Sequence, residues 1–392
     1  MIRSPANLYR QSDRLRASGT TFLRRSVLND ALLLTRFAFL LAFTVVALGA
    51  WTRLVDAGLG CPDWPGCYGH LTVPTSEQQL ARAAELFPEH TVDPAKGWPE
   101  MIHRYAASTL GLVIMWLAFL AFRWRRVAGY PAKHSYFLLF LVILQGMFGM
   151  WTVTLKLWPQ VVTLHLLGGM ATLTLLYMLS LRLKRLRDKS GDEEGWSEIR
   201  FDSLLLKDTG QHEWLLLWRL RHWASIAFLL IVLQIALGGW TSANYAAVAC
   251  PDFPQCQGQW LPNLSMEKGF NFTQHVGPNY LGGQLDGDGR VAIHLTHRVG
   301  ALIVLIFVGG LALYMLRRPM TLFLQRRAFW LLFALLAQIA IGISNVLFYF
   351  PLSLAVLHNL GGAFLLLTIS NLLWSLNAMH PPIPAKGVIR HA

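Results

Sequence analysis

The stretch ALGAWTRLVDAGLGCPDWPGCYG (residues 47–69) occurs a second time as ALGGWTSANYAAVACPDFPQCQG (236–258), at an offset of 189 residues. Each copy takes the end of an apolar run into a loop with two cysteines. Three further matches follow in the same order: HRYAASTLGLVI with HRVGALIVLI, LQGMFGMWTV with AQIAIGISNV, and VVTLHLLGGMATLTLL with LAVLHNLGGAFLLLTI. The chain therefore contains one unit twice, and both copies run in the same direction.

Long apolar blocks make up each copy. The 392-residue chain is 54% hydrophobic and only 14% charged, and a membrane helix needs about 20 mainly apolar residues. We predict an all-α integral membrane protein with eight transmembrane helices, arranged as two pseudo-symmetric four-helix bundles. The predicted spans are 33–53, 102–122, 134–154, 161–182, 222–242, 292–315, 327–347 and 353–376.

The repeats divide the chain into five segments. These are a cytoplasmic N-terminal tail (1–30), an N-terminal four-helix half (31–183), a cytoplasmic linker (184–221), a C-terminal four-helix half (222–377) and a cytoplasmic tail (378–392). The first 30 residues are polar and Arg-rich without a small-residue cleavage site, so we expect the first span to stay as a helix. The extreme N-terminus and residues 186–212 are predicted to be mobile.

The net charge of +13 is unevenly distributed. When the loops are assigned alternately to two sides, 26 of the 34 Lys and Arg residues fall on the side of the N-terminus, whereas the acidic residues divide 10 to 11. A Lys/Arg bias sets membrane orientation, so both termini are expected in the cytoplasm of a bacterium. The basic charge then indicates an inner-membrane protein that contacts anionic lipid, not one that binds nucleic acid.

All four cysteines fall into two Cys-x5-Cys pairs, Cys61 with Cys67 and Cys250 with Cys256. The predicted orientation places both pairs outside the cytoplasm, where disulfides persist. Prolines stiffen both loops, and no histidine stands at a zinc-finger spacing. We expect the disulfides Cys61–Cys67 and Cys250–Cys256; metal ligation and free redox thiols are the alternatives.

Four of the 13 histidines stand at repeat-related positions near the outer starts of spans: His103, His165, His297 and His358. The two in each half share one depth in the membrane. Imidazoles at one depth on different helices of a bundle can bind a metal between them, and haem iron with two axial histidines fits this arrangement. A hydrogen-bonded packing role is the alternative for each histidine taken alone.

Small and basic residues accompany the histidines. His165 and His358 are each followed by a glycine pair, which would let a flat macrocycle or another helix approach closely. Arg104 and Arg298 directly follow the other two histidines. As cations at the outer interface they could pair with haem propionates or extend to the headgroups.

The two halves also differ. Glu100 in the first half aligns with His294 in the second, and Arg53 aligns with Ser242. Two equal electron-carrying haems would not need this difference. A carboxylate three residues before His103 lies on the same helix face, where it could exchange a proton beside the haem edge. The alternative is an acid that stabilises a helix N-terminus.

These residues resemble the haem A synthase family, membrane enzymes that convert haem O to haem A for terminal oxidases. The resemblance rests on the first quoted stretch, EMIHR (100–104), the repeated His-Arg, LQGMFG, and LHLLGG with its copy LHNLGG. It covers residues 32 to 377. It implies stepwise oxidation of one porphyrin methyl to a formyl group through hydroxylated intermediates.

The resemblance also implies roles for residues. In such enzymes the C-terminal half holds a haem b cofactor and the N-terminal half holds the substrate haem. Carried onto this chain, His297, His358 and Arg298 would bind haem b, His103 and His165 would ligate the substrate haem, Glu100 would be catalytic, and Arg53 and Arg104 would contact propionates.

Three functions compete at this stage. The first is the haem-modifying enzyme, with haem O, membrane lipid, haem O synthase and an electron donor as partners. The second is a di-haem b electron-transfer protein, which predicts equivalent pockets, against the difference between Glu100 and His294. The third is a haem carrier without chemistry, which predicts weak sites, against four well-placed histidines.

Overall fold

A computed structural model describes residues 5–189 and 213–379, and within these ranges the chain is helical with no β-strand. Eight helices are long and apolar enough to cross a membrane, which confirms the predicted fold class. They are α1 (Pro5–Leu54), α3 (Pro94–Arg123), α4 (Ala132–Thr154), α5 (Pro159–Lys189), α6 (Glu213–Ala243), α8 (Gly287–Arg317), α9 (Leu322–Leu347) and α10 (Leu352–Ala378).

The helices run beyond the predicted spans, because hydropathy detects only their apolar middle. The Asp93 side chain accepts from Ala95 N and caps α3, and Asp286 accepts from Gly289 N and caps α8. Helix α1 enters the predicted N-terminal tail, and α5 and α6 enter the predicted linker from both sides. The remainder of the 186–212 stretch, from residue 190, lies outside the described residues.

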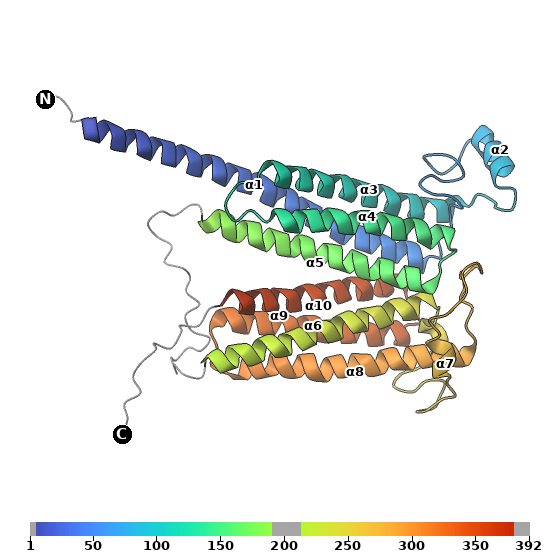
Figure 1. Cartoon of the computed structure of the whole chain (residues 1–392). Coiled ribbons are helices and arrows are strands. Elements are labelled where there is room, and N and C mark those ends of the chain that lie inside the picture. The colour runs from blue at the N-terminus through green and yellow to red at the C-terminus, as the bar shows by residue number, and fades with distance from the viewer. Residues whose placement is uncertain (1–4, 190–212, 380–392) are drawn as a thin grey trace, which may run out of the picture.

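Each half is a ring of four helices (Figure 1). In the first half α1 packs against α3, α3 against α4, α4 against α5, and α5 against α1; the second half repeats this order with α6, α8, α9 and α10. Helices α3 and α5 therefore stand at opposite corners of one ring, and α8 and α10 at opposite corners of the other. The predicted pair of four-helix bundles accounts for this packing.

The two rings meet through α1 against α10, α5 against α6, and α5 against α10. In the repeat, α1 corresponds to α6 and α5 to α10. The α1–α10 contact is therefore the counterpart of the α6–α5 contact, as a pseudo-twofold axis between the halves requires. Helices α1 and α10 have their chain-terminal ends at one end of the bundle, and the long loops project from the other (Figure 1).

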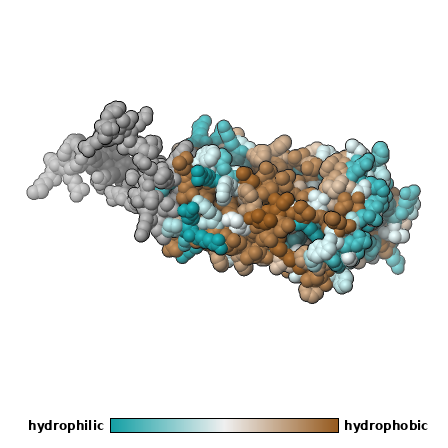
Figure 2. All heavy atoms as spheres, turned by 90° about the horizontal axis from the view of Figure 1, so that it is seen from below, coloured by the Kyte–Doolittle hydropathy of each residue, from teal (hydrophilic) through white to brown (hydrophobic). Residues whose placement is uncertain are grey.

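The surface carries a broad apolar belt between polar ends (Figure 2). Exposed side chains on the outward helix faces include Leu33, Phe140 and Ile306, which are 63%, 61% and 67% exposed. Water-soluble domains rarely expose a broad contiguous apolar surface, and the described helices include eight long and apolar enough to cross a membrane, so this belt is the lipid-facing surface of a multi-pass membrane protein.

The loop end holds the remaining elements. The first long loop contains α2 (Glu77–Leu86), and the second contains the 3₁₀ turn Ala247–Ala249 and α7 (Met266–Gly269). The same backbone features occur at matching positions in both loops, among them cis peptide bonds at Trp64–Pro65 and Phe253–Pro254. The sequence repeat therefore extends into the loops.

Candidate functional site

The four predicted histidines form two facing pairs, one inside each ring. His103 on α3 and His165 on α5 have ring centres 6.5 Å apart, with ring planes at 85°. His297 on α8 and His358 on α10 have ring centres 6.4 Å apart, at 73°. Each pair joins opposite corners of its ring, so it lies across the centre of a bundle.

This spacing suits one iron between each pair. A metal–imidazole bond is about 2 Å long, so two such bonds and the two ring radii place the ring centres about 6 Å apart. Within residues 5–189 and 213–379 no group of three or more His, Cys, Asp or Glu side chains is placed to hold a metal ion. Two histidines suffice when a macrocycle supplies the other ligands, as in haem. The donor set therefore fits haem.

Each imidazole lies against a glycine on a neighbouring helix. A Cβ added at Gly49 on α1 would lie 2.9 Å from Cε1 of His103, and one added at Gly342 on α9 would lie 2.9 Å from Cε1 of His358. The same atom lies 3.4 Å from a Cβ at Gly149 for His165, and 3.3 Å from one at Gly238 for His297. These glycines let the histidine rings approach the helix backbone closely.

Three of the histidines also touch a glutamine. The amide nitrogen of Gln234 on α6 donates to the carbonyl oxygen of His297 at 2.9 Å and lies 3.1 Å from its Nδ1. Gln338 on α9 has the same contacts with His358, at 2.9 and 3.3 Å. With its nitrogen turned toward the histidine, Gln145 on α4 lies 3.1 Å from the His165 oxygen and 3.0 Å from Nδ1.

The sequence analysis missed these glutamines. Their signal is a Gln-x-x-x-Gly spacing, present as Gln145–Gly149, Gln234–Gly238 and Gln338–Gly342. Residues four apart share a helix face, so each glutamine stands one turn from the glycine that its histidine touches. An amide in an apolar run is polar but has no characteristic metal chemistry, and only the packing shows which histidine it meets.

Of the two neighbours expected for the glycine pairs, a macrocycle or another helix, the first glycine of each pair meets another helix. A Cβ at Gly168 or Gly361 would collide with the side chain of Gln145 or Gln338, respectively. The first glycine of each predicted pair therefore makes room for the glutamine amide of the adjacent helix. A Cβ added at Gly169, the second glycine of the pair in the first half, would have no atom within 4 Å.

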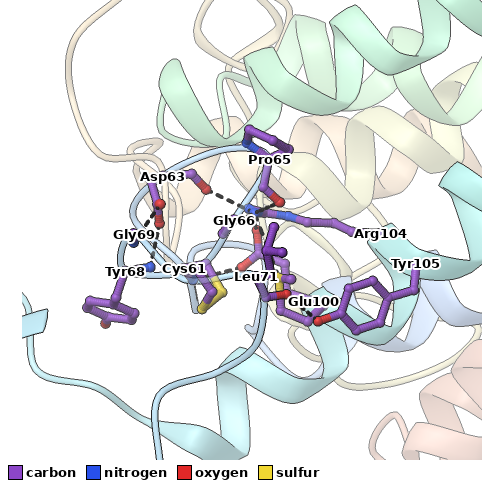
Figure 3. Close-up of a disulfide and its surroundings, with 12 residues drawn as sticks. Cys61, Asp63, Pro65, Gly66, Tyr68, Gly69, Leu71, Glu100, Arg104 and Tyr105 are labelled. Atoms are coloured by element: carbon purple, nitrogen blue, oxygen red, sulfur yellow. Dashed lines mark hydrogen bonds and ion pairs between the residues drawn. A yellow bond between two sulfur atoms is a disulfide. The ribbon is translucent and has the colours of Figure 1, made fainter. Parts of the chain in front are cut away.

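Glu100 is 4% exposed and is tied to the first disulfide loop (Figure 3). Its Oε2 accepts from Cys61 N at 3.0 Å, and its Oε1 accepts from Arg104 Nη2 at 2.5 Å. Because α3 begins at Pro94, its first turn holds no acidic residue, and stabilisation of the helix dipole falls off beyond that turn. The helix-terminus interpretation therefore does not apply to Glu100.

Both predicted propionate-binding arginines on the histidine helices face loop carbonyls. Arg104 Nη1 donates to Asp63 O at 2.9 Å and also to the oxygen of Gly66. Arg298 donates to Gln255 O and to Asp252 O, each at 2.8 Å. Each arginine thus ties a disulfide loop to the helix that bears a histidine, and the propionate contacts stay a prediction.

The halves differ next to these arginines. In the second half His294 takes the place of Glu100; it is 5% exposed, and its Nδ1 lies 3.1 Å from Ala246 O. Arg104 therefore has a carboxylate partner on its own helix, whereas Arg298 has His294 at the matching position. The predicted asymmetry is present as a buried ion pair in one half only.

The predicted disulfides are both formed, Cys61–Cys67 and Cys250–Cys256. Each loop is further closed by an aspartate: Asp63 accepts from the backbone N–H groups of Tyr68 and Gly69, and Asp252 accepts from those of Gln257 and Gly258. The cysteines are therefore structural elements of two matching caps over the histidine pairs.

Arg53 lies between the halves instead of beside a histidine pair. Its Nη2 donates to Ser242 O at 2.6 Å, its Nη1 lies 3.4 Å from Asp56 Oδ1, and its guanidinium lies 4.1 Å from the centre of the Tyr245 ring. Tyr245 in turn donates to Asp56 Oδ1 at 2.8 Å. The propionate contact of Arg53 stays a prediction.

Comparison with known proteins bears on these duplicated histidine sites. Residues 33–370 match the family model COX15-CtaA, described as "Cytochrome oxidase assembly protein". The chain belongs to this family. The match takes in both histidine pairs and at least part of each of the eight candidate membrane helices of the described chain.

Several curated relatives carry one name, "Heme A synthase". The protein of Shewanella oneidensis is 41% identical over 336 residues, which cover 86% of this chain and 93% of the relative. That of Caulobacter sp. is 27% identical, covering 91% and 98% of the two chains. That of Halalkalibacterium halodurans is 25% identical, covering 83% and 90%. The chain is thus similar to these proteins over nearly its whole length.

Proposed function

We propose that this protein is a haem A synthase, which oxidises one methyl group of haem O to a formyl group through hydroxylated intermediates. The observation that carries the proposal is the pair of matched two-histidine sites, of which only one has a buried carboxylate on the helix of its first histidine. The shared name of relatives that align over most of their length supports the same reaction. An electron carrier with two equal haems has no use for this asymmetry.

We assign the substrate to the N-terminal half and a haem b cofactor to the C-terminal half. His103 and His165 would ligate the iron of haem O, and His297 and His358 that of haem b. The support is Glu100, a proton-exchanging group that only the N-terminal half has next to its arginine. Haem b, when bound, supplies one-electron chemistry.

Glu100 is the proposed catalytic residue. Its carboxylate lies one turn before His103, and both of its oxygens accept hydrogen bonds. Protonation of the carboxylate would remove its negative charge and so weaken its ion pair with Arg104. Proton exchange at this carboxylate is therefore coupled to Arg104, which also holds the disulfide loop. The loop in turn shields the carboxylate from bulk water.

We further place the protein in a bacterial inner membrane, with both termini in the cytoplasm and both disulfide loops outside. The charge bias supports this orientation, and the disulfides suit an oxidising space. Haem O synthase and an electron donor are the proposed partners.

The first experiment extracts and chromatographs haem from cells that make haem O, with and without the protein. We expect haem A and its hydroxylated precursor only in its presence. Glu100→Gln keeps the side-chain size and an acceptor for Cys61 N–H but removes the charge, so this variant should retain its bound haem and lose the product. The exposed Glu89→Gln change is the control. Full activity of Glu100→Gln would remove Glu100 from the mechanism.

A second prediction separates cofactor from substrate. His297→Ala should lose most of the haem that remains bound through purification, whereas His103→Ala should retain most of it, because only the C-terminal half holds a permanent group. Haem absorbance per protein measures this, with the exposed loop variant His275→Ala as control. Equal losses from the two site variants would favour the di-haem electron carrier.

A further inference from the structure

The glutamine contacts described above recur at three of the four histidines, always with a glycine three residues after the histidine. That glycine is Gly168 after His165, Gly300 after His297 and Gly361 after His358. A Cβ at Gly300 would lie 2.2 Å from Gln234 Oε1, and one at Gly361 2.1 Å from Gln338 Oε1. Each glutamine and its glycine therefore form one unit, in which the missing side chain makes room for the amide.

The fourth histidine lacks both parts of this unit. By the repeat offsets, Val45 stands where Gln234 stands in the second half, and Ala106 stands where Gly300 stands. The His103 ring interacts with the backbone of Val45, as the His165 ring does with the backbone of Gln145, but no described side chain hydrogen-bonds to its buried Nδ1 atom. Among the four facing histidines, all of which the structure describes, His103 alone is in this position.

The chemistry of a ligand imidazole gives the glutamine a role. A neutral histidine that binds iron through Nε2 carries its proton on Nδ1, and the group that accepts this proton fixes the ring and raises its basicity. The Oε1 atoms of Gln234 and Gln338 are buried without a hydrogen-bond donor. Rotation about the soft terminal torsion of the side chain would bring each oxygen to Nδ1–H, in exchange for the bond that the amide nitrogen donates to the histidine carbonyl oxygen.

We propose that Gln145, Gln234 and Gln338 are positioning residues that hold His165, His297 and His358 as iron ligands, and that His103, which has no such partner, is the exchangeable ligand. The assignment of the exchangeable ligand to the substrate haem rests on the proposed function. The glutamine–histidine pairing does not depend on it. A substrate must enter and leave, so one weakly held ligand in its site, opposite one firmly held ligand, serves turnover.

The sequence context argues against simple packing as the reason for the difference. Val45–Gly49 and Gln234–Gly238 have the same spacing on equivalent helices, and both glycines contact their histidine. The approach of the helix is therefore retained at His103 while the amide is lost. Ala106 in place of the glycine agrees with the loss of the glutamine, because no amide has to fit beside the Ala106 Cβ.

The test adds the unit to the site that lacks it. Val45→Gln with Ala106→Gly is made in a His297→Ala chain, whose remaining bound haem lies in the N-terminal half. The full-length protein is loaded with ferrous protohaem. Absorbance spectra follow the transfer of this haem to apomyoglobin. They also follow the binding of carbon monoxide to the haem, which needs a free coordination position on the iron. We expect haem loss to slow about tenfold and carbon monoxide binding to weaken, with Ala106→Gly alone as control.

The reverse change is made in the other half. In a His103→Ala chain, Gln234→Val should speed haem loss about tenfold, and Gln234→Glu, which keeps an acceptor for Nδ1–H, should restore retention. The reduction potential should fall in the order Val, Gln, Glu, because a stronger acceptor makes the imidazole a better donor to ferric iron. A purely structural role would not produce this order.

Two results would overturn the proposal. One is haem loss within twofold of the parent after Val45→Gln with Ala106→Gly; a gain of retention cannot come from misfolding, so this arm does not depend on fragile variants. The other is an equal rate of haem loss from the His297→Ala chain and the His103→Ala chain when the glutamines of both are unchanged. Product chromatography tests the proposed function separately. If haem A is formed but the variants do not differ in haem retention, the proposed function stands and this inference fails. If retention differs but no haem A is formed, the inference stands and the proposed function fails.

Discussion

At the residue scale, four glycines decide how close each imidazole comes to its neighbouring helix. A Cβ at these positions would lie between 2.9 and 3.4 Å from a histidine Cε1. Glycine costs a helix interior about 1 kcal/mol relative to alanine, so its presence in apolar helices needs a reason. The contact with the histidine ring supplies that reason.

Gly342→Ala should therefore reduce haem binding without unfolding the protein. Its Cβ would lie 2.9 Å from His358 Cε1, and the ring would have to move out of line with His297. Gly310→Ala on α8, where an added Cβ meets no atom within 4 Å, is the matched control. Haem absorbance per protein and thermal unfolding measure the two effects. Equal haem contents in the two variants would show that the glycine contact is not needed.

The sequence predicts the residues with distinctive chemistry and misses those that act through contact. The histidines and cysteines stand out because polar or reactive side chains are rare in apolar runs. Gln234 is also polar, but an amide has no characteristic metal chemistry, and its contact with His297 appears only when α6 is packed against α8. The loop partners of Arg104 could not be predicted, because they lie about 40 residues away in sequence and depend on how the loop folds back.

At the element scale, the disulfide loops act as matched caps. Each is closed by a disulfide, held by an arginine from the histidine helix and bonded internally by one aspartate. In the second loop the backbone N–H groups of Gly258 and Gln257 hold the pKa of Asp252 below its ordinary value. The folded loop therefore favours the charged form of Asp252.

This pKa shift gives the second loop a defined pH response. A lowered folded pKa stabilises the loop at pH values above the ordinary value of 3.8, and the effect is lost as the pH falls through the folded pKa. Asp252→Asn should remove the effect at neutral pH. Hydrogen-exchange protection of the Gln257 and Gly258 amides measures it, with Tyr68 and Gly69 in the first loop as internal controls. Unchanged protection after the substitution would contradict the assignment.

At the scale of the whole molecule, the eight spans and the two bundles follow from the sequence. Long apolar blocks have one stable outcome in lipid, the helix, and the repeat fixes the packing order within each half. The contacts between the halves do not follow, because a repeat does not specify how its two copies meet. Helix ends were also missed, since caps such as Asp93 lie in polar segments that hydropathy cannot separate from loops.

The orientation of the molecule is testable with a phosphatase reporter that is active only outside the cytoplasm. Fused after Ala392, it should be inactive; fused to a chain ending at Leu264, after α6 and the second cysteine pair, it should be active. The reason is the excess of Lys and Arg on the side of the termini. The opposite pattern would reverse the proposed orientation and place both disulfides in the cytoplasm.

The contact around Arg53 has a consequence for the history of the chain. Arg53 meets Ser242, and Asp56 meets Tyr245, and in both cases the partners are repeat counterparts 189 residues apart. In a symmetric ancestor built from two identical subunits, each of these residues would have faced its own copy, and an arginine or an aspartate facing itself is repelled. Each of these contacts needs two different residues at equivalent positions, so a dimer of two identical chains could not form it, whereas a single chain that contains the repeat twice can.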